Sequence, residues 1–393
     1  MMVRPRQNRA RRLVTRLHLW LGLGLGGLLV LAGLTGSLLV FYVEIDAWLH
    51  PEQAAAGSAA PASYDRAIAT LHRAYPGKTG PWRIEVTHRA GAIPARYYNP
   101  PETAGRDFAP MLVWLSPDGT RVLRRDFWGD TAMTWVYDLH YRLLLGRLGG
   151  AIFGYAGLAL LVLLGSGLAA WWPRGSLAKA LRYKPDAAPR RRWRDQHKLA
   201  GLAGLPVLAL LTATGVMLAL PTESDAVLGR VLGPAQPLPQ VRAAPGVGAP
   251  ILPSAAARVA LDALPGARLA WIEIPGAAGG AYRLRVQVPG DPSARFPHSY
   301  VWIDPYRGSV LAAADASRAP LLGRFDNWLH PLHDGSAGGL ALRLIVLLGG
   351  GVPLVLFITG LRRWRAGANR PRRQSMRKMD AFLGAWSRGR KGR

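Results

Sequence analysis

The sequence contains no cysteine. Without thiolates the chain cannot form disulfides, thiolate-ligated iron–sulfur clusters, cysteine-based zinc sites or the covalent C-x-x-C-H attachment of haem. Any metal or cofactor would therefore have to be held by histidine, methionine, carboxylates or packing.

Acidic residues are also scarce. The chain has 23 Asp and Glu against 50 Lys and Arg, which gives a net charge of +27, yet half of its residues are hydrophobic. This combination is typical of a membrane protein whose charges flank its spans. A nucleic-acid binder is the other usual interpretation, but the basic residues cluster beside apolar segments rather than in a folded basic domain. We therefore predict a protein that contacts membrane lipid and not nucleic acid.

No nucleotide-binding motif is present. The glycines of the sequence GLGLGG, at residues 22–27, lie inside an apolar run with no strand before them, so they do not form a dinucleotide loop. Small residues in a span instead allow helices, or a flat macrocycle, to approach closely.

Four apolar segments are long enough to cross a bilayer, which takes about 20 residues. Three basic clusters flank them: the N-terminal tail, the loop after the second segment and the C-terminal tail. The excess of positive charge predicts that all three lie in the cytoplasm, with both termini. The predicted order is a basic tail (1–12), a first span (13–43), an external segment (44–139), a second span (140–172), a basic loop (173–196), a third span (197–220), an external segment (221–332), a fourth span (333–364) and a basic tail (365–393).

The chain contains an internal repeat. His18, Thr35-Gly36, Glu44 and Asp46 recur 179 residues later as His197, Thr214-Gly215, Glu223 and Asp225. A second frame pairs His140, Ser166-Gly167 and Trp171 with His333, Thr359-Gly360 and Trp364. The external segments repeat as well, since VWLSPDGTRVL at 113–123 matches VWIDPYRGSVL at 301–311. We therefore predict a membrane α+β fold: a four-helix transmembrane bundle built from two parallel repeats, with two periplasmic α+β domains.

Four of the nine histidines occupy equivalent positions in the repeats. Two-fold symmetry brings His18 together with His197 near the cytoplasmic face, and His140 together with His333 near the external face. Each pair could supply two axial imidazoles to a haem in the bundle core. His330 is an alternative outer ligand, but it aligns with Tyr137 in the other repeat, which favours His333.

Haem propionates would need cations near each pair. On the cytoplasmic side the candidates are Arg16, Arg194 and Lys198. On the external side they are Arg142 and Arg147.

The frame LHLWLGL…LTGSLLVFYVEID, DLHYRLLLG, DQHKLAGL…TATG and PLHDGSAGG…TGLRRW resembles the PepSY-associated transmembrane family. The resemblance covers nearly the whole chain, and the two external domains look like PepSY domains. Some members are inner-membrane ferric-siderophore reductases that hold two b-type haems. The resemblance implies that His18, His197, His140 and His333 are haem ligands in such an enzyme.

The expected function is therefore an inner-membrane conduit for electrons. A cytoplasmic or quinol donor would reduce the haem at His18 and His197, and the haem at His140 and His333 would reduce a ferric siderophore in the periplasm. One alternative is a PepSY anchor without haem that binds or regulates peptidases. Another is a metal transporter in which the histidines are transient ligands.

Overall fold

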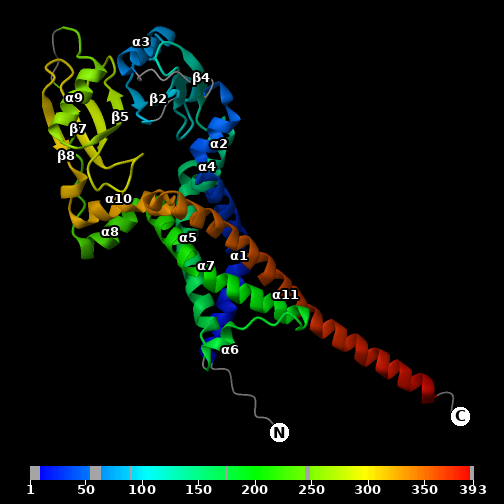
Figure 1. Ribbon diagram of the computed structural model, residues 1–393. Helices are drawn as coiled ribbons and strands as arrows, with labels where there is room; N and C mark the ends of the chain where they lie inside the picture. Colours follow the sequence, from blue (N-terminus) through cyan, green and yellow to red (C-terminus); the bar gives the residue numbers. More distant parts are fainter. Residues whose placement is uncertain (1–8, 54–62, 89–90, 174, 244–247, 390–393) are drawn as a thin grey trace. The chain divides into compact units, whose positions relative to one another are not determined.

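The structure is a computed structural model that describes residues 9–53, 63–88, 91–173, 175–243 and 248–389, with side chains described as far as residue 366 (Figure 1). Parts of the predicted segments lie outside the described residues: 1–8 and 390–393 of the basic tails, Arg174 of the basic loop, and 54–62, 89–90 and 244–247 of the external segments.

The helices and strands alternate along the chain. The helices are α1 (Arg9–Leu39), α2 (Tyr42–Leu49), α3 (Tyr64–Ala74), α4 (Ala132–Arg142), α5 (Gly146–Trp171), α6 (Leu177–Leu181), α7 (Pro189–Ala219), α8 (Pro221–Leu232), α9 (Pro253–Ala263), α10 (Leu321–His333) and α11 (Gly339–Gly389). The strands are β1 (Trp82–Glu85), β2 (Ile93–Tyr97), β3 (Met111–Leu115), β4 (Val122–Phe127), β5 (Arg268–Ile274), β6 (Tyr282–Gln287), β7 (Ser299–Ile303) and β8 (Val310–Ala314).

The chain divides into two compact units. Within the described residues, unit 1 consists of the chain up to Leu34, Ala159–Ala209 and the chain from Leu348 onward. Unit 2 consists of Thr35–Leu158 and Leu210–Leu347. Among the described residues, unit 1 contains helices and their connections without any strand, and unit 2 holds the eight strands.

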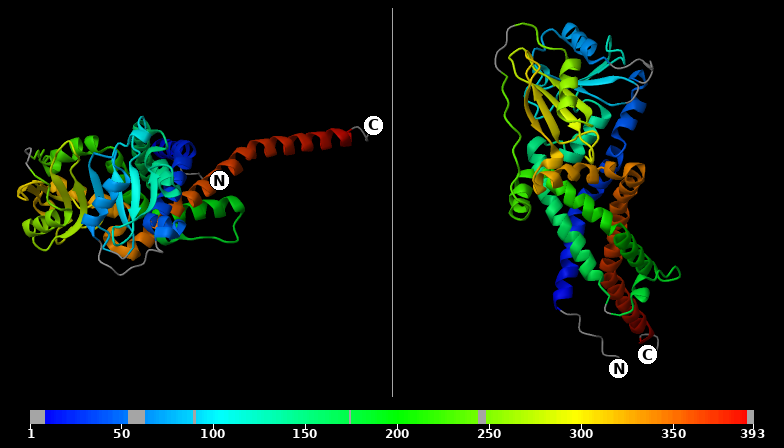
Figure 2. Two further views of the ribbon diagram at one scale, coloured as in Figure 1. Left: turned by 90° about the horizontal axis from the view of Figure 1, so that it is seen from above. Right: turned by 60° about the vertical axis from the view of Figure 1, so that its left-hand side comes forward.

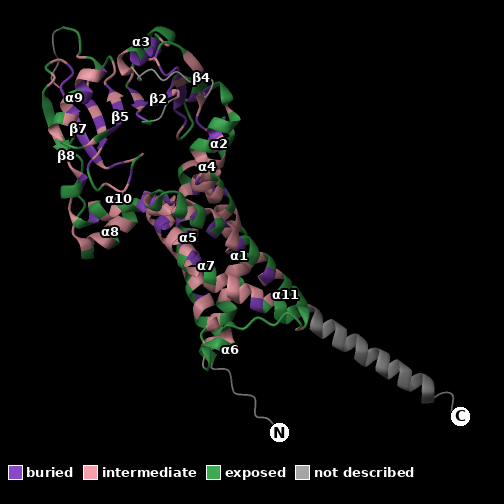
Figure 3. Ribbon diagram, viewed as in Figure 1, coloured by how far each residue is buried: buried purple, intermediate pink, exposed green. Residues whose placement is uncertain are grey.

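In the part of the chain that the structure describes, four helical segments are long and apolar enough to cross a membrane: Arg9–Leu39, Gly146–Trp171, Pro189–Ala219 and Ser336–Ala366. Each corresponds to one predicted span, although the bounds differ. Most of their surface is half-buried or exposed (Figure 3). Leu148 and Leu348, for example, are 67% and 73% exposed. Apolar side chains in that position are stable against lipid rather than water.

The predicted spans 140–172 and 333–364 begin at His140 and His333. In the structure both histidines instead lie on shorter helices that precede the spanning helices. His140 belongs to α4, which ends at Arg142, and α5 begins only at Gly146. Between them Leu143 and Leu144 have positive φ angles of 51° and 59°, which a continuing α-helix does not allow. In the other repeat α10 ends at His333, and Gly335 follows with φ of 78°.

Among the described residues the strands form one eight-stranded antiparallel sheet in the order β4-β3-β2-β1-β5-β6-β7-β8. Figure 2 shows the strands from two further directions. The sequence predicts two separate external domains. Each external segment does supply four strands and one helix that packs on the sheet, α3 in the first segment and α9 in the second. The two halves nevertheless share one sheet, because β1 pairs with β5 from Trp82↔Ile274 to Glu85↔Trp271. The pairing satisfies two strand edges that would otherwise expose unpaired backbone groups.

One face of the sheet carries the hydrophobic core. Helices α3 and α9 cover it, and Leu71 and Ala260 are completely buried against the strands. Alternation along the strands directs every second side chain to the core; in β6, for example, Tyr282, Leu284 and Val286 are buried. The intervening residues, including several arginines, lie on the opposite face.

Candidate functional site

The two predicted histidine pairs are each brought together, and each lies within a single unit. In unit 1 the ring centroids of His18 on α1 and His197 on α7 are 6.1 Å apart, with an angle of 81° between the ring planes. In unit 2 the centroids of His140 on α4 and His333 on α10 are also 6.1 Å apart, at 49°.

The inner imidazoles are anchored through Nδ1. Nδ1 of His18 lies 3.1 Å from the carbonyl oxygen of Leu163 and 3.2 Å from the hydroxyl oxygen of Ser166. Nδ1 of His197 lies 3.0 Å from the carbonyl oxygen of Leu356 and 3.1 Å from Oγ1 of Thr359. The two anchors occupy equivalent positions of the two repeats.

The outer imidazoles are anchored in the same way. Oγ1 of Thr35 lies 2.9 Å from Nδ1 of His140, and Oγ1 of Thr214 lies 2.9 Å from Nδ1 of His333. All four hydroxyl residues of the two sites, Thr35, Ser166, Thr214 and Thr359, are buried. Each of the four histidines therefore meets a buried hydroxyl on a neighbouring helix.

The hydroxyl groups determine which ring nitrogen is protonated. Ser166 donates its own hydroxyl proton to the carbonyl of Leu163 at 2.8 Å, and Thr214 donates to the carbonyl of Leu210 at 2.8 Å. Thr359 likewise donates to the carbonyl of Val355 at 2.6 Å. A hydroxyl whose proton is engaged acts toward its histidine as an acceptor, so Nδ1 carries the proton. Nε2 is then left with a lone pair, which is the form that binds a metal.

Nε2 has no competing partner at three of these positions. Within the described part of the chain, the Nε2 atoms of His18, His197 and His333 make no hydrogen bond. Burial, followed by the proximity of His140, lowers the pKa of His333 to about 3, so this ring is neutral at physiological pH.

A glycine next to each hydroxyl gives the imidazole its space. A Cβ added at Gly167 would lie 2.8 Å from Cε1 of His18, and one at Gly36 would lie 3.0 Å from Cε1 of His140. The corresponding distances are 3.1 Å for Gly215 with His333 and 3.4 Å for Gly360 with His197. In each repeated Thr-Gly or Ser-Gly dipeptide, the hydroxyl orients the imidazole ring through Nδ1. The glycine, which lacks a Cβ, leaves room for the ring beside the helix.

The spacing of the pairs fits two imidazoles bound to one metal ion. With nitrogen–metal bonds of about 2.0 Å in line, the two ring centroids would be roughly 6.3 Å apart. The observed 6.1 Å agrees closely in both pairs. Among the described residues no group of three or more His, Asp or Glu is gathered to hold a metal ion by itself. A haem supplies its own four equatorial nitrogens and needs only two axial ligands, so the donor set fits haem.

His330 is engaged elsewhere. Its Nδ1 lies 3.2 Å from Oδ2 of Asp334, and its ring packs edge-on against Phe296, with a centroid distance of 5.1 Å. The residue that faces His140 is His333.

The cations proposed for haem propionates differ in their surroundings. Arg194 and Lys198 both lie beside the buried carboxylate of Asp195, at 3.4 and 3.5 Å. Arg147 lies 3.8 Å from Asp107. Arg142 packs over the rings of Phe108 and Tyr141. Arg16 is exposed.

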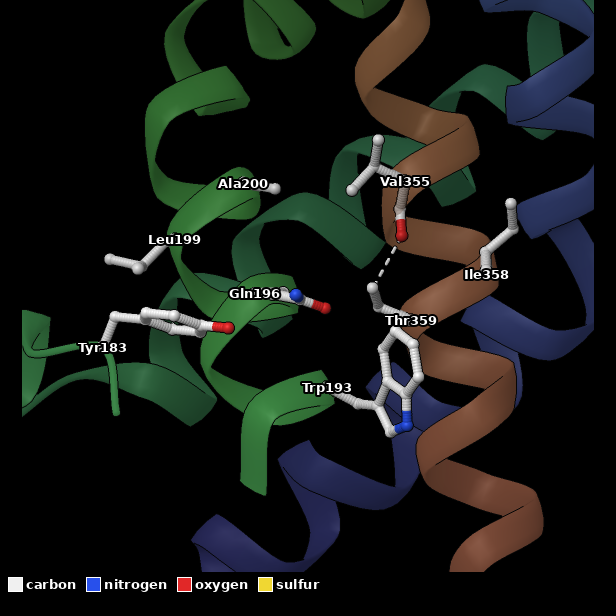
Figure 4. A pocket seen from close by; sticks show the side chains of 8 residues that line it. All are labelled: Tyr183, Trp193, Gln196, Leu199, Ala200, Val355, Ile358 and Thr359. Carbon is white, nitrogen blue, oxygen red and sulfur yellow. Dashed lines mark hydrogen bonds between the residues drawn. The ribbon is translucent and has the colours of Figure 1, made fainter. Parts of the chain in front are cut away.

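A cavity of about 600 Å³ lies next to the inner pair, between α7 and α11 (Figure 4). Gln196 and Thr359 approach it from opposite helices, and Thr359 is the residue that anchors His197. Its full lining consists of Tyr183, Trp193, Gln196, Leu199, Ala200, Val355, Ile358 and Thr359. The cavity therefore combines aromatic and aliphatic walls with two polar groups.

The model of the PepSY-associated TM region matches residues 15–366. The match covers most of the chain, including all four histidines, so the protein belongs to this family of membrane proteins. No curated protein matches the sequence significantly.

The sequence identifies the four histidines and the repeated hydroxyl-glycine dipeptides. It does not reveal that each histidine ring contacts one of these dipeptides. The equal spacing of both features in the two repeats is the available signal. The hydroxyl and histidine partners are at least 105 residues apart in the chain, so only the tertiary structure could pair them.

Proposed function

We propose that this membrane protein is a dihaem b electron conduit of the inner membrane that reduces the iron of ferric siderophores in the periplasm. The observation that carries the proposal is the spacing of the two histidine pairs, 6.1 Å between ring centroids in each, with Nδ1 of every ring anchored. His18 and His197 would hold one haem, and His140 and His333 the other.

Bound haem would supply one-electron chemistry at each pair. The protein's own groups orient and tune the ligands. The acceptors for Nδ1–H fix the ring positions and raise the basicity of Nε2, as outer-shell partners of metal-bound histidines generally do. The glycines keep the rings close to the neighbouring helix, and the apolar surroundings limit the access of water.

The basic segments support the proposed direction of transfer. They favour a cytoplasmic location for the N-terminal tail, the loop 173–196 and the C-terminal tail, which leaves the sheet of unit 2 in the periplasm. One electron converts Fe(III) of the chelate to Fe(II). The softer ion binds hard oxygen ligands less tightly, so reduction releases it.

The cavity beside Thr359 favours a quinol over a soluble electron donor. A volume of about 600 Å³ is enough for a quinone ring, and the apolar walls from α7 and α11 suit a lipid-soluble molecule. Gln196 offers a hydrogen-bonding group to a ring oxygen. Oxidation of one quinol releases two electrons and two protons, so each quinol would reduce two ferric chelates.

The test is a visible absorption spectrum of the purified protein, oxidised and then reduced with dithionite, together with the ratio of haem to protein. Two haems per chain with sharp low-spin b-type bands are expected. A folded protein that stays colourless after haem is supplied would refute the proposal. That result would favour the haem-free PepSY anchor, whereas binding of metal ions without haem would favour the transporter.

A further inference from the structure

The face of the sheet opposite the hydrophobic core carries an unusual arrangement of arginines. Arg83 on β1 is directly opposite Arg96 on β2 in the strand register. Like charges in this position destabilise a sheet. Such destabilisation is expected where the two charges together bind a ligand.

A third arginine and a tryptophan complete the group. Arg285 on β6 is opposite Trp271 on β5, and β5 is the neighbour of β1. The guanidinium carbon of Arg83 lies 4.4 Å from the ring centroid of Trp271, and that of Arg96 lies 5.3 Å from it. We call this group the arginine face; it consists of Arg83, Arg96, Arg285 and Trp271.

The other arginines near this group are neutralised. Arg283 pairs with Glu273 at 2.6 Å, and Arg295 pairs with Glu85 at 3.0 Å. Arg124 pairs with Asp46 and Asp126. Their charges are therefore balanced within the fold.

The arginine face lacks close ion pairs of its own. Two carboxylates border it: Glu273, opposite Arg83 in the strand register, pairs with Arg283, and Asp291 interacts electrostatically with Arg285. Among the described residues, Arg83, Arg96 and Arg285 form no ion pair with a carboxylate. Arg83 and Arg285 donate hydrogen bonds to the hydroxyls of Tyr98 and Tyr300, and their Nε atoms are buried without a hydrogen-bond partner. Burial lowers the pKa of Arg285, and the nearby charge of Arg83 lowers it further. Such positive charge is stabilised by an anion that supplies oxygen acceptors.

Aromatic contacts connect this face to the outer histidine pair within unit 2. Phe296 stacks on Trp271 with centroids 6.1 Å apart, and it contacts the ring of His330 at 5.1 Å. From the other half of the sheet, Arg96 lies over Trp128, whose ring is 5.0 Å from that of Tyr137. His330 and Tyr137 each precede an outer histidine by three residues, which is about one helical turn.

We propose that the arginine face binds an anionic ferric chelate, of the type with catecholate oxygens, next to the outer pair. The inference rests on the proposed function and adds the class of its substrate. Guanidinium groups present paired N–H donors to the paired oxygens of such ligands. Aromatic rings of the ligand can stack on the guanidinium planes. Trp271 is only 1% exposed, with Phe296 stacked on its ring and Arg83 over it, so it positions the arginines and does not itself contact the ligand. A neutral chelate built from hydroxamates gains none of the charge complementarity.

The experiment measures binding without electron transfer. A gallium(III) tricatecholate is redox-inert and anionic, and a neutral gallium(III) trihydroxamate is its control. Both are titrated by calorimetry into the full-length protein in detergent, at low and high salt. The anionic chelate is expected to bind, and to bind more weakly as salt screens the charges.

Four substitutions test the location of the site. Arg83→Gln and Arg96→Gln should each weaken binding of the anionic chelate by roughly ten- to a hundredfold, because a charge-assisted contact is lost. Arg96→Lys keeps the charge and should retain part of the affinity. Arg125→Gln removes the same charge from an exposed position on β4 and should leave binding unchanged. Equal binding of the neutral chelate, or unchanged binding by Arg83→Gln and Arg96→Gln, would overturn the proposal.

The failure of this inference and that of the proposed function are distinguishable. A dihaem protein whose chelate binding ignores the arginines would overturn the substrate class and leave the conduit intact. A haem-free protein that binds the anionic chelate through the arginines would refute the electron conduit and leave the substrate class intact.

Discussion

The hydroxyl oxygen of Thr214 lies 2.9 Å from Nδ1 of His333, and Thr35 has the same relationship to His140. Both hydroxyls belong to helices other than those of their histidines. The same arrangement at the inner pair shows that one local device is used four times, and its parts can be tested separately.

Thr214→Val removes the acceptor for Nδ1–H while preserving the shape of the side chain. Loss of such an outer-shell partner typically lowers metal affinity by about 10- to 100-fold, so the outer haem should be lost more readily and its reduction potential should change. The measurements are the haem-to-protein ratio and a redox titration. Thr212→Val, two residues earlier in α7, is the matched control and should behave as wild type. Indistinguishable behaviour of the two variants would contradict the role of the hydroxyl.

Gly167→Ala places a methyl group 2.8 Å from Cε1 of His18, closer than carbon atoms tolerate. The imidazole has to shift, so we expect a marked loss of the inner haem with the outer haem retained. Gly360→Ala is the graded control, because its methyl would lie at an ordinary contact distance of 3.4 Å from His197. The haem-to-protein ratio and the b-type bands report both effects. Equal loss in the two variants would show that the glycine contacts do not limit the site.

His333→Ala should remove the outer haem, whereas His330→Tyr should retain both haems. Tyrosine already occupies the equivalent position 137 of the other repeat, and His330 contacts Asp334 and Phe296 rather than His140. Haem content and the reduced spectrum distinguish the ligands. If His330→Tyr lost one haem while His333→Ala kept two, the assignment of the outer ligand would have to be reversed.

His298 should make the protein less stable in acid. Burial, followed by the charge of Arg285, lowers its pKa to about 4 from an ordinary value of 6.5. The unfolded chain therefore binds more protons than the folded protein between pH 6.5 and 4, and stability falls as pH decreases through this window. The thermal midpoint of His298→Gln should decline less over that range than the midpoint of wild type. An identical decline would show that His298 does not contribute.

Asp326 should change the stability of the protein with pH in the direction opposite to that of His298. Burial, followed by the nearby Asp225, raises its pKa to about 6. The folded protein then binds more protons than the unfolded chain, so the contribution of Asp326 to stability is present in acid and is lost as pH rises through about 6. Asp326→Asn should therefore raise the thermal midpoint at pH 7 more than at pH 4. A shift that is the same at both pH values would rule out titration of this carboxyl as the cause.

Much of the fold can be predicted from the sequence because the relevant signals are local. The apolar runs predict the four spans, and each predicted span corresponds to one long apolar helical segment. The breaks that separate His140 and His333 from the spanning helices depend on positive φ angles at Leu143 and Leu144, and leucine gives no signal of such a conformation. The pairing of β1 with β5 joins two segments that lie on opposite sides of two spans in the sequence, so local patterns do not reveal it.

The sequence by itself determined the membrane location, the repeat and the candidate histidines, because hydrophobicity and spacing are properties of the linear chain. The tertiary structure decided which groups meet. It set a hydroxyl and a glycine against each ring of the histidine pairs that the repeat predicts, and it gathered Arg83, Arg96 and Arg285 around Trp271. These contacts depend on helix packing and strand register between distant segments, where a displacement of one residue would turn a side chain to another face.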